Sequence, residues 1–165
     1  MAKRDQLRSK VYEAEQQVRS ALERAASAGA LDFFGSLLPP PVERRFETLA
    51  QVRDYLDSVC SSAEFVAAFG ELPVPKLRGR GGDSQAHYEF DNQTIALPMT
   101  SDWAARELVV LHELAHHVVG LRQPDAAYHG AEFSTVYCRL VELVIGGPAG
   151  LLLRAALDGE GVVVG

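Results

Sequence analysis

One stretch, residues 103–120 with the sequence WAARELVVLHELAHHVVG, constrains the fold of this chain more than any other. Its large apolar residues fall on every side of a helix instead of along one stripe: Val109, Val110, Leu111, Leu114, Val118 and Val119. A helix that is apolar all round is buried on all sides. We therefore predict a central helix from Asp102 or Trp103 to Val119, with the rest of the chain packed around it.

Residues that commonly cap helices indicate where this helix begins and ends. Ser101 or Asp102 is the expected N-cap, because a short polar side chain there accepts a backbone N–H of the first turn. Gly120 is the expected C-cap, because glycine readily adopts the left-handed conformation that ends many helices. Pro124 follows and prevents any continuation of the helix.

Helical spacing and capping signals predict five further helices. Their expected residues are 4–28, 48–60, 61–70, 130–145 and 148–157. The first is a long amphipathic helix that ends near Gly29. The second opens with Thr48 and Gln51 at the spacing of a capping box, and Ser61 and Glu64 repeat that spacing for the third.

The segments between these helices predict loops and a small sheet. The three prolines of DFFGSLLPPP, residues 32–41, favour a loop, and two prolines make residues 72–78 irregular or an edge strand. HYEF and QTIALP flank Asp91-Asn92 and indicate a β-hairpin. The tail EGVVVG either adds a final strand or frays. The expected fold is therefore α+β, with a small, mainly antiparallel sheet and flanking helices.

Length and composition set the frame for these elements. The chain has 165 residues, of which 47 % are hydrophobic and 23 % are charged, so it can bury a core. We expect an N-terminal helix over residues 1–30 and a main part over residues 42–158, which together make a single domain. A net charge of −6 gives no strong nucleic-acid signal, and no run of about 18 apolar residues predicts a membrane span.

The cysteines and the first residues of the chain bear on its compartment. Cys60 and Cys138 lie far apart in two predicted helices, which favours reduced thiols over a disulfide framework. The charged start MAKRDQLRSKVYEAE has no apolar stretch of the kind that secretory signals contain. A cytoplasmic location is the expectation, and the sequence does not indicate an oligomeric state.

The central helix carries the sequence H-E-x-x-H, with His112, Glu113 and His116 as its defined positions. At about 100° per residue, two histidines four residues apart lie on one helix face, about one turn apart in height. Both imidazoles can then reach one Zn²⁺ ion, while Glu113 lies further round and can take a proton from the water beside the ion. Satisfied core histidines are the alternative, and they would need a buried partner for each ring.

A catalytic zinc takes three protein ligands and keeps one open position, so a third ligand is required. The metzincin spacing would place a histidine at position 122, where this chain has Arg122. We expect His129 instead, because the chain can turn back after Pro124 and Gly130 can give it an unusual backbone angle. Glu132 and, less favourably, Asp125 are the alternatives.

Three other side chains are candidates for a supporting role. His117 points away from the expected metal, so helix packing through a hydrogen bond is its simplest interpretation, and a supporting or substrate-binding role is the alternative. Tyr128 precedes His129 and could donate a hydrogen bond to a developing oxyanion. Glu132 could instead accept a hydrogen bond from a ligand imidazole and orient it.

HELAHH followed by HGAEF resembles the zincin pattern H-E-x-x-H…H-G-x-x-F of SprT-like and related minimal metallopeptidases, over residues 88–146. RDQLRSKVYEAE, ETLAQVRDYLDSVC and WAARELVVLHELAHH extend a resemblance to a small group of actinobacterial metallohydrolases that has no assigned substrate. The resemblance implies a minimal zincin-like domain with an active-site helix, Zn²⁺ on His112, His116 and His129, and Glu113 as general base. SprT-like DNA-repair proteases also carry DNA-binding parts, usually a zinc ribbon, whereas this acidic chain has no CxxC pair.

The expected activity is therefore zinc-dependent hydrolysis of a peptide bond in a peptide or protein substrate. QTIALP is expected to be an edge strand that pairs with the extended substrate. A protease dedicated to one protein target is a narrower form of this prediction. The alternative from another class is a non-catalytic zinc-binding or protein-interaction module, in which the site would be closed and the N-terminal helix would bind a partner.

Overall fold

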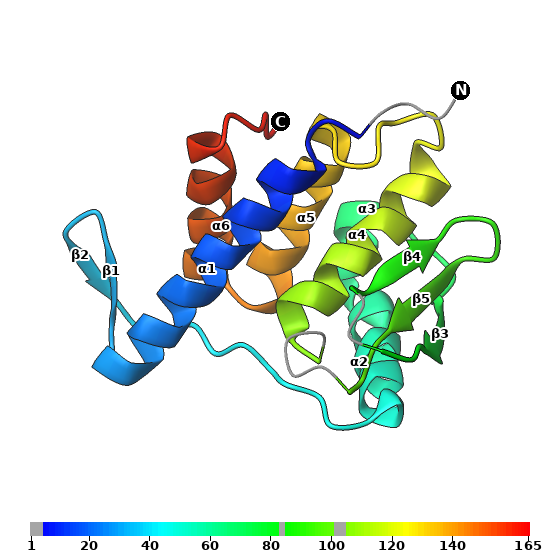
Figure 1. Cartoon of the computed structure of the whole chain (residues 1–165), viewed down its shortest axis with the longest axis horizontal. Coiled ribbons are helices and arrows are strands. Elements are labelled where there is room, and N and C mark those ends of the chain that lie inside the picture. Colours follow the sequence, from blue (N-terminus) through cyan, green and yellow to red (C-terminus); the bar gives the residue numbers. More distant parts are fainter. Residues whose placement is uncertain (1–4, 83–84, 101–104) are drawn as a thin grey trace. The chain divides into compact units, whose positions relative to one another are not determined.

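Six helices and five short strands make up the described part of the chain, residues 5–82, 85–100 and 105–165, in the computed structural model (Figure 1). The helices are α1 (Arg8–Ala28), α2 (Leu49–Ser61), α3 (Ala63–Phe69), α4 (Glu107–Arg122), α5 (Ala131–Val144) and α6 (Gly147–Gly159). The strands are β1 (Leu31–Phe33), β2 (Ser36–Leu38), β3 (Lys76–Gly79), β4 (His87–Glu89) and β5 (Thr94–Leu97). The predicted α+β class is confirmed. None of the described helices is long and apolar enough to span a membrane.

The chain forms two compact units. The first, which we call the helical unit, combines Met1–Glu43 with Asp125–Gly165 and contains α1, β1, β2, α5 and α6. The second, which we call the sheet unit, is the continuous segment Arg44–Pro124 and contains the other six elements. Each unit is described below by itself.

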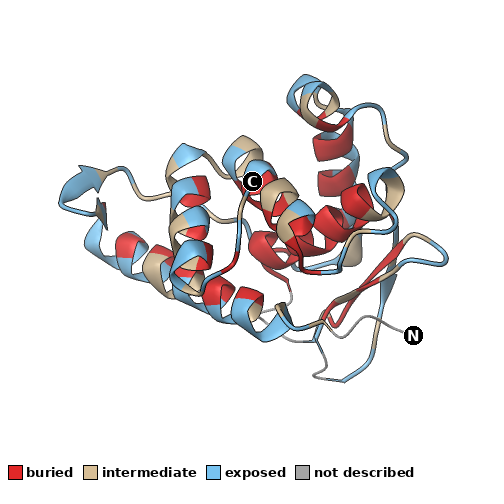
Figure 2. Cartoon of the chain, turned by 90° about the horizontal axis from the view of Figure 1, so that it is seen from above, coloured by how far each residue is buried: buried red, intermediate tan, exposed pale blue. Residues whose placement is uncertain are grey.

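In the helical unit, α6 packs against both α1 and α5 (Figure 1). The predicted apolar stripe of α1 is buried, and its outer side is exposed (Figure 2). Gly29 ends this helix as expected, because it takes the left-handed conformation with φ of 77° and its N–H bonds back to Ala25. The final residues, 162–165, form no strand, although Val162 is buried.

A short hairpin in the helical unit corrects the prediction of a loop over residues 32–41. Strands β1 and β2 pair antiparallel, with Phe33 opposite Ser36, and β1 packs against α1. The turn places Phe34 and Gly35 at positive φ, 49° and 87°, which suits a tight two-residue turn. The Asp32 carboxylate accepts the Gly35 N–H at 2.9 Å. The three prolines come only after the second strand.

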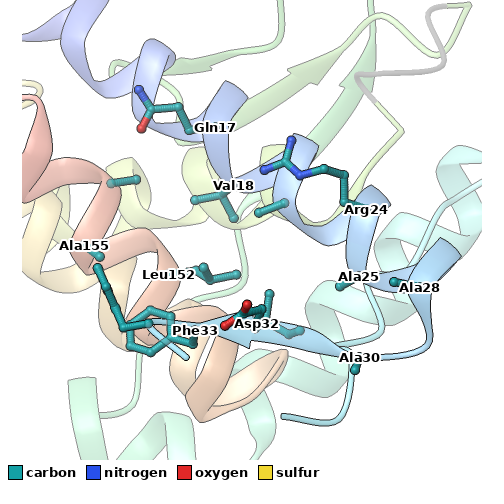
Figure 3. Close-up of a pocket in the computed structure, with 14 residues that line it drawn as sticks. Gln17, Val18, Arg24, Ala25, Ala28, Ala30, Asp32, Phe33, Leu152 and Ala155 are labelled. Carbon is teal, nitrogen blue, oxygen red and sulfur yellow. The ribbon is translucent and has the colours of Figure 1, made fainter. Parts of the chain in front are cut away.

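The same unit has a hollow of about 510 Å³ between α1, β1 and α6 (Figure 3). Alanines of the two helices and other apolar side chains make up most of its wall, including Val18, Phe33 and Leu152. Its polar lining consists of Gln17, Arg24 and Asp32, and no histidine or cysteine lines it.

In the sheet unit, three strands form one sheet in the order β3-β5-β4. Strands β4 and β5 make the predicted hairpin, with Glu89 opposite Thr94, and Gln93 rather than the Asp91-Asn92 pair takes positive φ. Strand β3 is an edge strand, and it runs parallel to β5. The sheet is therefore mixed, which corrects the expectation of a mainly antiparallel one.

Helices α2 and α3 of the sheet unit begin at short polar caps. The Thr48 hydroxyl accepts the Gln51 N–H at 3.2 Å, so Thr48 is the N-cap as predicted, while the Gln51 side chain accepts the N–H of Glu47 at 2.7 Å rather than that of Thr48. The second cap lies one residue later than predicted, because Ser62 rather than Ser61 accepts the Phe65 N–H. The Ser61 hydroxyl instead donates back to the carbonyl of Asp57, one turn earlier in α2.

Candidate metal centre

Helix α4 is buried over its first thirteen residues, as its all-round apolar sequence predicts. Its first turn is tied to an earlier part of the sheet unit. The Glu107 carboxylate accepts the Arg44 N–H at 3.0 Å, and the Glu107 N–H donates to the Arg44 carbonyl at 3.0 Å. An acidic side chain at this end of a helix also interacts favourably with the helix dipole. The position of α4 in its unit is thus fixed by hydrogen bonds as well as by packing.

The ends of α4 differ from the prediction. The helix begins at Glu107 and ends at Arg122, and the predicted N-cap residues, Ser101 and Asp102, lie outside the described residues. Gly120 is wrong as a C-cap, because it lies inside the last turn. A Cβ atom there would lie 3.1 Å from the Phe90 ring. Gly120 therefore lets an aromatic side chain of the hairpin approach the helix closely.

The first two candidate ligands lie on the same face of α4, as their spacing predicts. The ring centroids of His112 and His116 are 5.0 Å apart, and the ring planes meet at 66°. The Phe90 ring packs against the second of these imidazoles, with its centroid 5.7 Å from that of His116. The hairpin of β4 and β5 thus holds one of the two imidazoles in place, and β4 packs along α4 (Figure 1).

His117 is fully buried, and both of its ring nitrogens have protein partners. Nε2 lies 2.7 Å from the Pro73 carbonyl oxygen, which can only accept, so Nε2 carries the proton. Nδ1 then accepts from the Tyr88 hydroxyl at 2.8 Å. Burial lowers the pKa of His117 and raises that of Tyr88 to about 12, which keeps the imidazole neutral and the phenol protonated. His117 therefore joins α4 to β4 and to the segment before β3.

His129 precedes α5 in the helical unit, and three side chains surround its ring. Its Nδ1 lies 2.5 Å from the carboxylate of Asp5, a residue that the sequence did not single out. The Phe133 ring packs edge-on at a centroid distance of 4.9 Å, and the Tyr12 ring lies 6.0 Å away. No local sequence pattern indicates the Asp5 contact, because the two residues are 124 positions apart.

Gly130 has a different role from the one that the sequence suggested. Its φ is −78°, so it needs no unusual backbone angle, and that part of the prediction is wrong. An added Cβ would lie 3.1 Å from the Ala127 Cβ and 3.2 Å from a carboxylate oxygen of Glu132. The glycine therefore allows a tight approach of the chain just before α5, next to His129.

Among the described residues, one group of histidine, cysteine or acidic side chains could hold a metal ion, and it consists of His112, His116 and His129. Each offers one ring nitrogen, and these nitrogens lie within 4.8 Å of one another. Ligands about 2.1 Å from a tetrahedral zinc ion lie about 3.4 Å apart, so the separations are of the required order. Three imidazoles with one position left over suit zinc and are the donor set of some catalytic zinc sites.

The other candidate residues have different exposures. Glu113 is 3 % exposed, and the three histidines are 2 %, 7 % and 5 % exposed (His112, His116 and His129). Glu132 is exposed, in the first turn of α5 and close to Gly130. Tyr128 is 54 % exposed, so its ring lies largely at the surface. Of these three, Glu113 is the one that is buried.

The predicted substrate strand QTIALP is not an edge strand. β5 is the central strand of its sheet, with β3 on one side and β4 on the other. Its backbone groups already pair with both neighbours, so it cannot also pair with an extended peptide. This corrects the expectation, and the edge positions of the sheet belong to β3 and β4.

Comparisons of this chain with models of protein families, with curated proteins and with solved structures gave no match. The side chains described above are therefore the basis for assigning a function to this chain.

Proposed function

We propose that this protein is a zinc-dependent hydrolase, and specifically a metallopeptidase, in which His112, His116 and His129 hold Zn²⁺. The observation that supports this most strongly is the group of three buried histidines, whose ring nitrogens lie within 4.8 Å of one another. A zinc ion held there would supply a Lewis acid that polarises a carbonyl and lowers the pKa of a water toward about 7.

Glu113 is the general base of this proposal. It accepts a proton from the attacking water and passes it to the leaving amine when the C–N bond breaks. Its position next to His112 on α4, and its low exposure, support this role. A purely structural zinc site has no use for a base at this position.

A peptide substrate would pair with β4, the antiparallel edge strand of the sheet unit. Strand β4 packs along α4, and Phe90, directly after it, contacts His116. An extended backbone added to a sheet edge gains a row of hydrogen bonds and runs in one direction along it. This arrangement favours peptides over small, compact substrates.

The metal content of purified, tag-free protein tests the first part of the proposal. Elemental mass spectrometry of the wild type is expected to find about one zinc ion per chain, as three protein ligands and one open position require. The His129→Ala variant is expected to lose it while remaining folded by circular dichroism. If the folded wild type contains no metal, the proposed zinc site and the proposed hydrolase activity are both wrong.

Glu113→Gln tests the second part of the proposal. The variant is expected to bind as much zinc as the wild type, because the amide keeps the shape of the side chain and neither form is a ligand. Peptide hydrolysis is expected to fall by about 10²–10⁴-fold, the usual contribution of a general base. If Glu113→Gln cleaves a fluorogenic peptide library as fast as the wild type, Glu113 is not the base.

A non-catalytic zinc module is the second candidate. The low exposure of the three histidines and of Glu113 favours it. A closed site would hold zinc but would not admit a substrate. A peptide hydroxamate distinguishes the two candidates, because it binds a zinc ion that has an open position. Hydroxamate binding without cleavage of casein would instead indicate a protease that acts on one particular protein.

A further inference from the structure

Asp5 lies just before α1, and its carboxylate meets the ring of His129 at the start of α5. The distance from Asp5 Oδ2 to His129 Nδ1 is 2.5 Å. The Asp5 and His129 side chains are 21 % and 6 % exposed, so the contact is partly buried. An exposed ion pair would have more freedom to exchange for water.

The position of the His129 ring is further restricted by two aromatic side chains. Phe133 packs against it in an edge-on arrangement, with the ring planes at 73°. The ring of Tyr12, in the first turns of α1, also lies near the imidazole, with the two ring planes at 54°. A 180° flip of the imidazole would therefore disturb its hydrogen bond to Asp5 and its contacts with the two aromatic rings.

The chemistry of the pair fixes which nitrogen of His129 is protonated. An ionised carboxylate can only accept a hydrogen bond, so Nδ1 must carry the proton. In a neutral imidazole the lone pair is then on Nε2, which is the atom that a metal would take. A carboxylate in this position also makes the imidazole a better donor to a metal.

On this basis we infer that Asp5 is a positioning residue, which holds His129 in the Nδ1–H form and so prepares Nε2 as the third metal ligand. This inference rests on the proposed function for its metal, but not for the tautomer itself. It makes the segment before α1 part of the metal centre, so that zinc retention depends on residues at the N-terminal end of the described chain.

The first test uses the metal-free full chain at mildly alkaline pH, with ¹⁵N NMR of the histidine side chains. His129 of the wild type is expected to carry its proton on Nδ1. In Asp5→Ala the proton is expected to move largely to Nε2, the site that histidine side chains ordinarily prefer. Wild-type protein with an unprotonated His129 Nδ1 would overturn the inference, whatever the metal content.

The second test measures zinc affinity by competition with a chromophoric chelator. Asp5→Ala and the milder Asp5→Asn are expected to bind zinc about 10–100-fold more weakly than the wild type, which is the usual cost of removing such a neighbour of a ligand. Glu13→Gln is the matched control, because it removes the same charge from an exposed position on α1. Its affinity is expected to equal that of the wild type.

Two outcomes separate this inference from the proposed function. If no variant and no wild-type protein binds zinc, the proposed function fails, and the NMR measurement alone decides the role of Asp5. If the wild type binds zinc and both Asp5 variants bind it equally well, the proposed function stands and Asp5 is not a positioning residue.

Discussion

His116 and His117 are neighbours on one helix, yet their surroundings differ in kind. His117 faces Tyr88 and Pro73, and each of its nitrogens is committed to one of them. His116 faces another imidazole and a phenyl ring, and it belongs to the group of three histidines. A step of about 100° around the helix separates the two environments. Residue type alone therefore does not distinguish a packing histidine from a candidate ligand, whereas position on the helix does.

The largest effect that distinguishes the two histidines is expected for His116→Ala. This variant is expected to lose zinc and hydrolysis together, because a site reduced to two protein ligands binds zinc far more weakly. The loss should exceed the roughly 100-fold change expected for a neighbour of a ligand. Zinc stoichiometry after gel filtration and a chelator titration measure it. Unchanged zinc content would place His116 with the packing histidines.

His117→Ala is expected to show the opposite behaviour. It leaves the buried Tyr88 hydroxyl and Pro73 carbonyl without their partner and opens a cavity, so the free energy of unfolding should fall by about 2–4 kcal/mol. Urea denaturation of the metal-free protein measures this change. Zinc affinity of the folded variant should remain close to that of the wild type. A folded His117→Ala variant that binds no zinc would erase the distinction between the two histidines.

Tyr88→Phe tests the surroundings of His117 with a smaller change. It removes only the hydroxyl that donates to His117 Nδ1 and keeps the ring that packs against Phe90. The free energy of unfolding is expected to fall by about 1–2 kcal/mol, because one buried acceptor loses its donor. The same urea titration detects this, with zinc affinity as the second readout. A loss as large as that of His117→Ala would mean that the Pro73 contact contributes little.

The sequence allowed correct prediction of features that depend on neighbouring residues. The all-round apolar pattern predicted a buried α4, and Thr48 predicted the start of α2. The β4–β5 hairpin followed from two β-rich runs around a polar pair. In each case the signal spans no more than about twenty residues, so the local pattern contains most of what determines the structure.

Most of the features that the sequence did not predict depend on contacts between distant residues or on the space available to a side chain. The parallel pairing of β3 with β5 joins strands separated by two loops, and no local pattern indicates its direction. Glycine ends many helices, so the sequence predicts a cap at Gly120, but here this glycine makes room for Phe90. The role of Asp5 was not predicted either, because its partner His129 is 124 positions away in the sequence. The β1–β2 hairpin was missed for a local reason, since Phe34 at positive φ is an unusual turn residue.

The division of the chain also sets an order of events during its synthesis. The sheet unit is one uninterrupted segment, Arg44–Pro124, whereas the helical unit needs residues from both sides of it. The residues of the sheet unit therefore leave the ribosome before α5 and α6 do, and domains tend to fold as they emerge. Helix α1 must wait for its partner α6, which follows the whole sheet unit in the chain. The contact between Asp5 and His129 belongs to this late stage.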